Sequence, residues 1–147
     1  MNDTDPVQST RAEPIALWLG YAGLIPFVAG AVLSWQLPAE WRPFTVAALS
    51  AYAAVIVSFL GGIHWGIGLR DGTPWLFVWG VLPSLVAAVA LMLPPRHALL
   101  IHALMLLLCY AVDRRVYPAH ALQAWLSLRW RLSLVASMSC FVAAASG

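Results

Sequence analysis

The apolar run from Phe44 to Leu69 ends in Phe59-Leu60-Gly61-Gly62-Ile63-His64-Trp65-Gly66. Its length suits a membrane-spanning helix, which needs roughly 20 predominantly apolar residues. Small side chains recur at every fourth position of the run, at Ala54, Ser58, Gly62 and Gly66. Small residues at this spacing let the backbone of a second helix approach closely inside a bilayer. The run therefore predicts a membrane-embedded helix that packs tightly against a neighbour.

The composition of the whole chain agrees with a membrane protein. Of its 147 residues, 62% are hydrophobic and 10% are charged, and the mean hydropathy is +0.81. Soluble domains carry about 25% charged residues. The net charge of +2 is too small to indicate a nucleic-acid partner. We expect membrane lipids as partners and no nucleic acid.

Five apolar stretches predict an all-α, polytopic bundle of five spans. Residues 1–14 are expected to form a disordered tail before a single domain of residues 15–147. Pro26 and Pro83 lie inside the first and third stretches and should kink them. The predicted spans are Ile15–Trp35, Phe44–Leu69, Trp75–Leu93, His97–Asp113, and a fifth that ends at Ser146 and reaches spanning length only if it begins near Trp125.

The distribution of arginines predicts the orientation. With the N-terminus inside, that side holds six arginines and the other side holds only Arg42 and Arg96. Because basic residues accumulate on the cytoplasmic side, the pattern favours an N-inside, C-outside topology. The fourth connection, residues 114–128, has apolar residues at helical spacing after Pro118 and predicts an interfacial helix before the fifth span.

Three polar side chains from separate spans are predicted to meet near the inner membrane face. On a helical wheel, Gly61 and His64 point away from the Gly62/Gly66 side, so the second span should have neighbours on both faces. Asp113 falls at the end of the fourth span, where the helix dipole disfavours an anion. Arg129 begins the fifth span at the same depth and would supply a cation.

This expected cluster of His64, Asp113 and Arg129 has two interpretations. The favoured one is an ion pair with a supporting histidine that fixes three helices. The other is a site for a polar headgroup or a proton-coupled ligand, with His64 as the titratable group and Trp65 and Trp79 beside it.

Other arrangements of reactive side chains are weaker. His64 and His102 would be separated by roughly 20 Å along parallel helices, too far for one haem to bridge. Cys109 and Cys140 lie at different depths and predict free thiols. The sequence carries no zinc-type spacing, phosphate loop or nucleophile elbow. We therefore expect no metal and no cofactor.

Several motifs resemble those of the transmembrane protein 69-like family, a domain of unknown function. They are the Gly23–Phe27 segment, the Phe59–Gly66 segment, Asp113, and Trp125 followed by Arg129. Leu126 departs from the tyrosine expected after that tryptophan. The resemblance implies an integral protein of a bacterial or mitochondrial inner membrane, here the bacterial inner membrane, and it implies no established activity.

Three functions remain open at this point. The first is a non-enzymatic structural, assembly or accessory protein of an energy-transducing membrane, within a larger membrane complex or a homo-oligomer. The second is a binding or carrier protein for a quinone, lipid or porphyrin in an inner-side cavity around His64. Catalysis ranks last, because His64 has no convincing nucleophile or metal set beside it.

Overall fold

The computed structural model describes the backbone of residues 6–146 and the side chains of residues 14–146. Its residues form α-helices and short 3₁₀ helices, with no strand in the described part of the chain. The all-α prediction is therefore confirmed. The helices are α1 (Pro6–Ala22), α2 (Ile25–Gln36), α3 (Arg42–Asp71), α4 (Pro74–Ala90), α5 (Pro95–Val116) and α6 (Leu126–Ala144).

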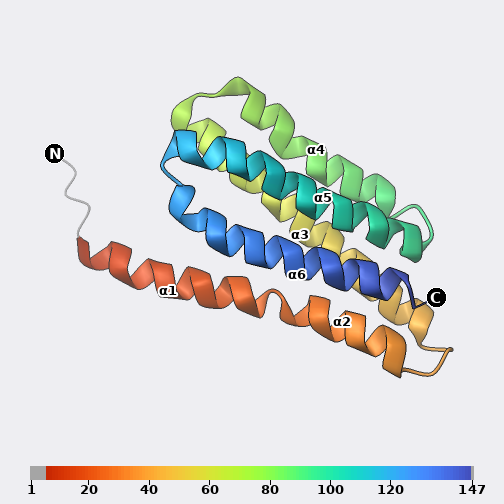
Figure 1. The fold of residues 1–147 in the computed structure, drawn as a ribbon. Helices are drawn as coiled ribbons and strands as arrows, with labels where there is room; N and C mark the ends of the chain where they lie inside the picture. The colour runs from red at the N-terminus through yellow and green to blue at the C-terminus, as the bar shows by residue number, and fades with distance from the viewer. Residues whose placement is uncertain (1–5, 147) are drawn as a thin grey trace.

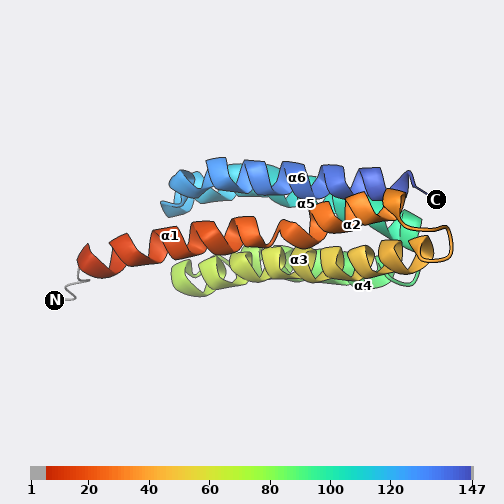
Figure 2. The same ribbon diagram turned by 90° about the horizontal axis from the view of Figure 1, so that it is seen from below.

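These helices form five rods that lie side by side, with α1 and α2 joined end to end as the first rod (Figures 1 and 2). α3 is central, since it contacts α2, α4, α5 and α6. The described N-terminal end lies beside the α3–α4 and α5–α6 connections, and the C-terminus lies at the opposite end (Figure 1). The rods therefore alternate in direction along the chain.

Three of the rods are long and apolar enough to cross a membrane by themselves. They are residues Pro14–Gln36, Arg42–Asp71 and Pro95–His120, while α4 is apolar but shorter. α6 contains Arg129 and Arg131 in its first two turns. With three such helices packed side by side, the chain is a polytopic membrane protein built as a helical bundle.

The first rod is broken where proline predicts a kink. Pro26 lacks an N–H group and lies at the start of α2. The Gly23 carbonyl in the break accepts a hydrogen bond of 2.9 Å from the Tyr52 hydroxyl of α3. This side chain supplies the partner that a backbone group in the membrane requires. By contrast, α4 continues as one helix through Pro83.

The start of the chain is more helical than expected. α1 begins at Pro6 and includes residues 6–14, which the sequence assigned to a disordered tail. Pro6 suits the first helical position because its missing N–H would have no intrahelical partner there. Residues 1–5 of the expected tail lie outside the described residues.

α3 packs closely against α4 through the face that carries Gly61. This is not the face of Gly62 and Gly66, to which the four-residue spacing drew attention. A Cβ atom on Gly61 would lie 2.2 Å from the Gly80 carbonyl oxygen, so the backbones meet at this pair. Gly62 and Gly66, predicted to pack against a helix, face open space instead. Ala54 is buried in the core and Ser58 is half-buried. The spacing alone did not identify which glycines make the contact.

The α5–α6 connection also differs from its prediction. It contains two short 3₁₀ helices, Tyr117–His120 and Gln123–Trp125, where an amphipathic α-helix was expected. Between them Ala121 adopts a left-handed conformation with φ of 58°. A helix cannot continue through such a residue, so the segment forms a compact turn between α5 and α6.

We expect Gly61→Ala to destabilise the protein, because the new methyl group would collide with the α4 backbone. The free energy of unfolding should fall by about 1–3 kcal/mol, the usual range for overpacking. Thermal unfolding in a mild detergent measures the change. Gly62→Ala is the matched control on the same helix, and its open surroundings should leave stability unchanged or slightly higher. Equal losses in the two variants would contradict the proposed α3–α4 contact.

Candidate functional site

Asp113 is the centre of a buried cluster of charged and polar side chains. It lies near the end of α5 with no exposed surface. Arg129, in the first turn of α6, donates from Nε to Asp113 Oδ2 over 2.8 Å. The Nη2 atom of Arg129 lies 2.6 Å from the same oxygen. α5 and α6 are thus joined by an ion pair at the end of the bundle where the described chain begins (Figure 1).

His64 of α3 reaches the other oxygen of the same carboxylate. Its Nε2 atom lies 3.3 Å from Asp113 Oδ1, and only 1% of the side chain is exposed. Its Nδ1 atom lies 3.2 Å from the Leu60 carbonyl oxygen, one turn earlier in α3. One buried carboxylate therefore connects three helices that are distant in the sequence.

Aromatic rings close the cluster on the side of α4 and the α5–α6 connection. The Trp79 ring stands edge-on to His64 at 6.3 Å between ring centres. The Tyr117 ring centre lies 6.4 Å from that of His64. Trp65, the other tryptophan predicted here, points elsewhere and donates its indole N–H to the Phe77 carbonyl over 2.9 Å. Trp65 therefore ties α3 to α4 and is not part of the cluster.

Several polar atoms in this region have no aligned hydrogen bond. These buried atoms are His64 Nε2, Trp79 Nε1, Asp113 Oδ1, Arg129 Nη2 and Ser133 Oγ. The first, third and fourth have ion-pair contacts that compensate part of the loss. An unpaired buried polar group costs about 1–3 kcal/mol. Three of the five atoms belong to His64, Asp113 and Arg129, so this cluster relies on ion-pair contacts as well as on hydrogen bonds.

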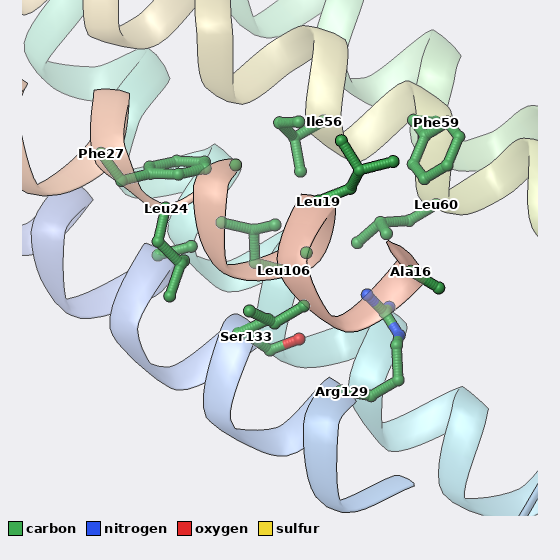
Figure 3. Close-up of a pocket in the computed structure, with 14 residues that line it drawn as sticks. Ala16, Leu19, Leu24, Phe27, Ile56, Phe59, Leu60, Leu106, Arg129 and Ser133 are labelled. Atoms are coloured by element: carbon green, nitrogen blue, oxygen red, sulfur yellow. The ribbon is translucent and has the colours of Figure 1, made fainter. Parts of the chain in front are cut away.

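A cavity of about 410 Å³ adjoins the cluster. It lies between α1–α2, α3, α5 and α6, and twelve of its fourteen lining residues are apolar or glycine. The two exceptions are Arg129 and Ser133, which project from α6 toward the helix carrying Ala16 and Leu19 (Figure 3). The cavity is therefore apolar except at Arg129 and Ser133, which we call its polar corner. An apolar pocket with a few polar groups is typical of ligand sites.

His102 and Cys140 lie away from this corner, whereas Cys109 lies one turn before Asp113 on α5. His102 is buried between α3 and α4, with its ring nitrogens 3.5 Å from Ser50 Oγ and from the Ala87 carbonyl oxygen. Cys109 and Cys140 are buried free thiols. Among the described residues, no group of three potential metal ligands is placed to hold an ion.

A second ion-pair group lies on the exposed surface. Arg70 donates to Asp71 Oδ1 over 2.7 Å, and His120 contacts the other oxygen of that carboxylate. Arg70 also donates to the His120 carbonyl, which attaches the α5–α6 connection to the end of α3.

Some residues of the site gave no strong sequence signal. Tyr117 belongs to no motif and matters only because of what surrounds it. Ser133 follows the Trp125–Arg129 motif and shares a helical face with Arg129. Gly80 is an isolated glycine in an apolar helix, yet it allows α4 to reach the face of α3 that carries His64. A partner for the small residues of α3 could have been sought among the glycines of the third span.

The fold and this site define a polytopic α-helical membrane protein with a charge cluster inside the bundle. The model of a family described as a protein of unknown function (DUF3429) matches residues 12–145, and the chain belongs to that family. No solved structure is significantly similar to it.

Two similar proteins are named transmembrane protein 69. The one from Xenopus tropicalis is 39% identical over 82 residues, which cover 52% of this chain and 32% of the relative. The one from Mus musculus is 39% identical over 59 residues, 40% of this chain and 24% of the relative. The matched segments thus span about a third or less of these relatives, and they support the transmembrane assignment.

We expect Asp113→Ala to lower the free energy of unfolding by about 3–5 kcal/mol, because it leaves the Arg129 guanidinium buried without its counter-ion. Chemical or thermal unfolding in detergent measures the loss. Asp71→Ala is the matched control: it removes an exposed ion pair, which is worth about 0–1 kcal/mol. A loss at Asp113 no larger than at Asp71 would mean that the buried pair does not hold the helices together.

Proposed function

We propose that this protein binds or carries a lipophilic small molecule in the cavity between α1–α2, α3, α5 and α6. The single observation that carries the proposal is the pairing of an apolar cavity with a polar corner formed by Arg129 and Ser133. The volume of about 410 Å³ falls within the range of small-molecule sites.

The way into the cavity supports a ligand that comes from the bilayer. Leu19 of α1 and Phe59 of α3 both line the cavity, yet 61% and 65% of their surfaces are exposed. The wall between α1 and α3 is therefore open toward the surface that lipid covers. A lipophilic molecule could enter sideways without passing through water.

The loose packing of the first rod supports the same route. Only 11% of the residues in the most apolar window of Pro14–Gln36 are buried, against 44% for Arg42–Asp71. The break at Gly23 separates α1 from α2. Tyr52 of α3 bonds the break itself, and its ring packs against Phe27 of α2. α1 can thus adjust to an occupant while α2 stays in place.

We place the protein in the bacterial inner membrane with its N-terminus inside, as the family resemblance and the arginine pattern imply. Arg70, Arg114 and Arg115 lie at the ends of helices next to the described start of the chain, and Arg42 and Arg96 lie at the opposite end. This asymmetry supports the orientation through the positive-inside rule. Reporter fusions to the two termini test it.

A second candidate is a structural or assembly role in a larger membrane complex. It is favoured by an outward-facing stripe on α3 made of Val55, Phe59, Gly62, Gly66 and Leu69. Gly62 and Gly66 have open space in front of them, so they form a notch that a helix of another chain could enter.

Filling the cavity should abolish ligand binding and leave the fold intact. Ala136→Leu inserts a larger side chain from α6, and Ala16→Phe does the same from α1 if the first variant unfolds. Native mass spectrometry of protein extracted gently from its membrane should then show a bound lipophile on the unmodified chain and on the control variant, and none on the variants that fill the cavity. Ala51→Phe, exposed on α3 and away from the cavity, is the control. A lipophile retained equally by all variants would refute binding in this cavity.

The assembly role predicts that Gly62→Leu together with Gly66→Leu releases a co-purifying partner. The bulky side chains would keep a second helix from the notch, and they meet nothing inside this chain. Size-exclusion chromatography after mild solubilisation measures the change in assembly size. If the unmodified chain already migrates alone, or the double variant keeps its partner, the notch is not an assembly surface.

A further inference from the structure

The polar corner of the cavity contains the guanidinium of Arg129, which can only donate hydrogen bonds, and the hydroxyl of Ser133, which can donate or accept. Ser133 is 2% exposed and its Oγ has no partner. Arg129 reaches the cavity with a guanidinium of which only Nε makes an aligned hydrogen bond. Ser133 follows Arg129 by four residues, so both side chains lie on one face of α6, one turn apart. An oxygen placed between them could accept from both.

The net charge around this corner depends on the protonation state of His64. It is positive when both ring nitrogens carry a proton, which is the state in which both contacts of His64 are favourable. The Nδ1 atom faces the Leu60 carbonyl oxygen at 3.2 Å, and Nε2 faces Asp113 Oδ1 at 3.3 Å. Both neighbours are acceptors, so both contacts are favourable only when each ring nitrogen carries a proton. In that state two cations, His64 and Arg129, share the single carboxylate of Asp113.

Among the side chains that the structure describes, residues 14–146, no other charged group contacts the cluster from the packed elements. Trp79 of α4, Tyr117 of the connection and Cys109 of α5 are the remaining polar neighbours among the described residues. Tyr117 additionally interacts with the Arg129 side chain. An excess positive charge in a region away from water is costly unless an anion compensates it.

We infer that the molecule bound in this cavity is an amphiphile with an anionic headgroup, which pairs with Arg129 and accepts a hydrogen bond from Ser133. This inference rests on the proposed function and specifies its ligand. The apolar chain of the amphiphile lies along Leu24, Phe27 and Leu106, on the side of the cavity away from Arg129 (Figure 3). The headgroup chemistry is that of a carboxylate or a phosphate, as in a free fatty acid or an anionic phospholipid.

The test compares two probes with the same chain, hexadecanesulfonate and hexadecanol, in nanodiscs of phosphatidylcholine. The full chain should retain the sulfonate about tenfold more tightly than the alcohol, after correction for empty nanodiscs. Arg129→Gln should remove this preference and Ser133→Ala should reduce it. Arg131→Gln deletes the same charge from an exposed position on the same helix, and it should keep the preference.

The possible failures can be told apart. If the alcohol binds as tightly as the sulfonate, a lipophile site exists and the anionic headgroup is refuted. If neither probe is retained above empty nanodiscs, the proposed function itself fails. If Arg131→Gln removes the preference as fully as Arg129→Gln, the effect is general surface charge, which also refutes the inference.

Two further arms complete the experiment. Should Arg129→Gln fail to fold, the replacement is Arg129→Lys combined with Ser133→Ala. This double variant keeps the positive charge but removes the planar guanidinium and the serine hydroxyl, and a reduced preference for the sulfonate is again expected. Retention of palmitate compared with dipalmitoyl phosphatidic acid distinguishes a fatty acid from a phospholipid as the source of the anion. Binding of either supports the inference, and binding of neither contradicts it.

Discussion

The carboxylate of Asp113 is the interaction on which the arrangement of this bundle depends. It is shielded completely from solvent, it pairs with Arg129 of α6, and it receives His64 of α3 on its second oxygen. A charged side chain within a membrane-spanning bundle is expensive unless it is paired. Loss of Arg129 would leave the Asp113 carboxylate buried without its counter-ion, and His64 would lose its contact with the second oxygen in any other register. The register that joins all three side chains is therefore favoured. Apolar packing in lipid would not select that register, since lipid tails solvate apolar faces equally well.

The small residues of α3 and α4 make this arrangement sterically possible. His64 lies between Gly61 and Gly68 on the face that contacts α4, and both glycines are in close contact with that helix. Without them α4 would stand further away, and Trp79 could not cover His64. The close backbone contact and the charge cluster therefore act together. The glycine contact allows α4 to lie close to α3, and the charge cluster sets the register of α5 and α6 against α3.

Much of this could be read from the sequence, and the residues show why the rest could not. Lengths and polarity predicted the all-α bundle, and helical geometry placed His64, Asp113 and Arg129 at one depth, where the structure brings them into contact. That calculation works because depth along a straight helix depends on residue number alone. The rotation of a helix about its own axis is harder to predict. Gly62 and Gly66 have the conspicuous four-residue spacing, but the glycine of α3 that meets Gly80 is Gly61. The partner face depends on the neighbour, and a single helix does not contain that information.

The location of the cavity was predicted wrongly for a related reason. The sequence placed it around His64, Trp65 and Trp79, none of which lines it, because the cavity results from what α1 fails to cover. Pro26 and the Gly23–Tyr52 hydrogen bond turn the first rod at mid-length, so α2 packs into the bundle while α1 leaves space over α6. Arg129 stands at the boundary between that space and the carboxylate of Asp113. The same guanidinium is therefore both a structural counter-ion and, among the residues that the structure describes, the only charged group lining the cavity. The structural and functional interpretations of the cluster are thus compatible, because a residue that fixes the helices is also presented, rigidly and already oriented, to whatever occupies the cavity.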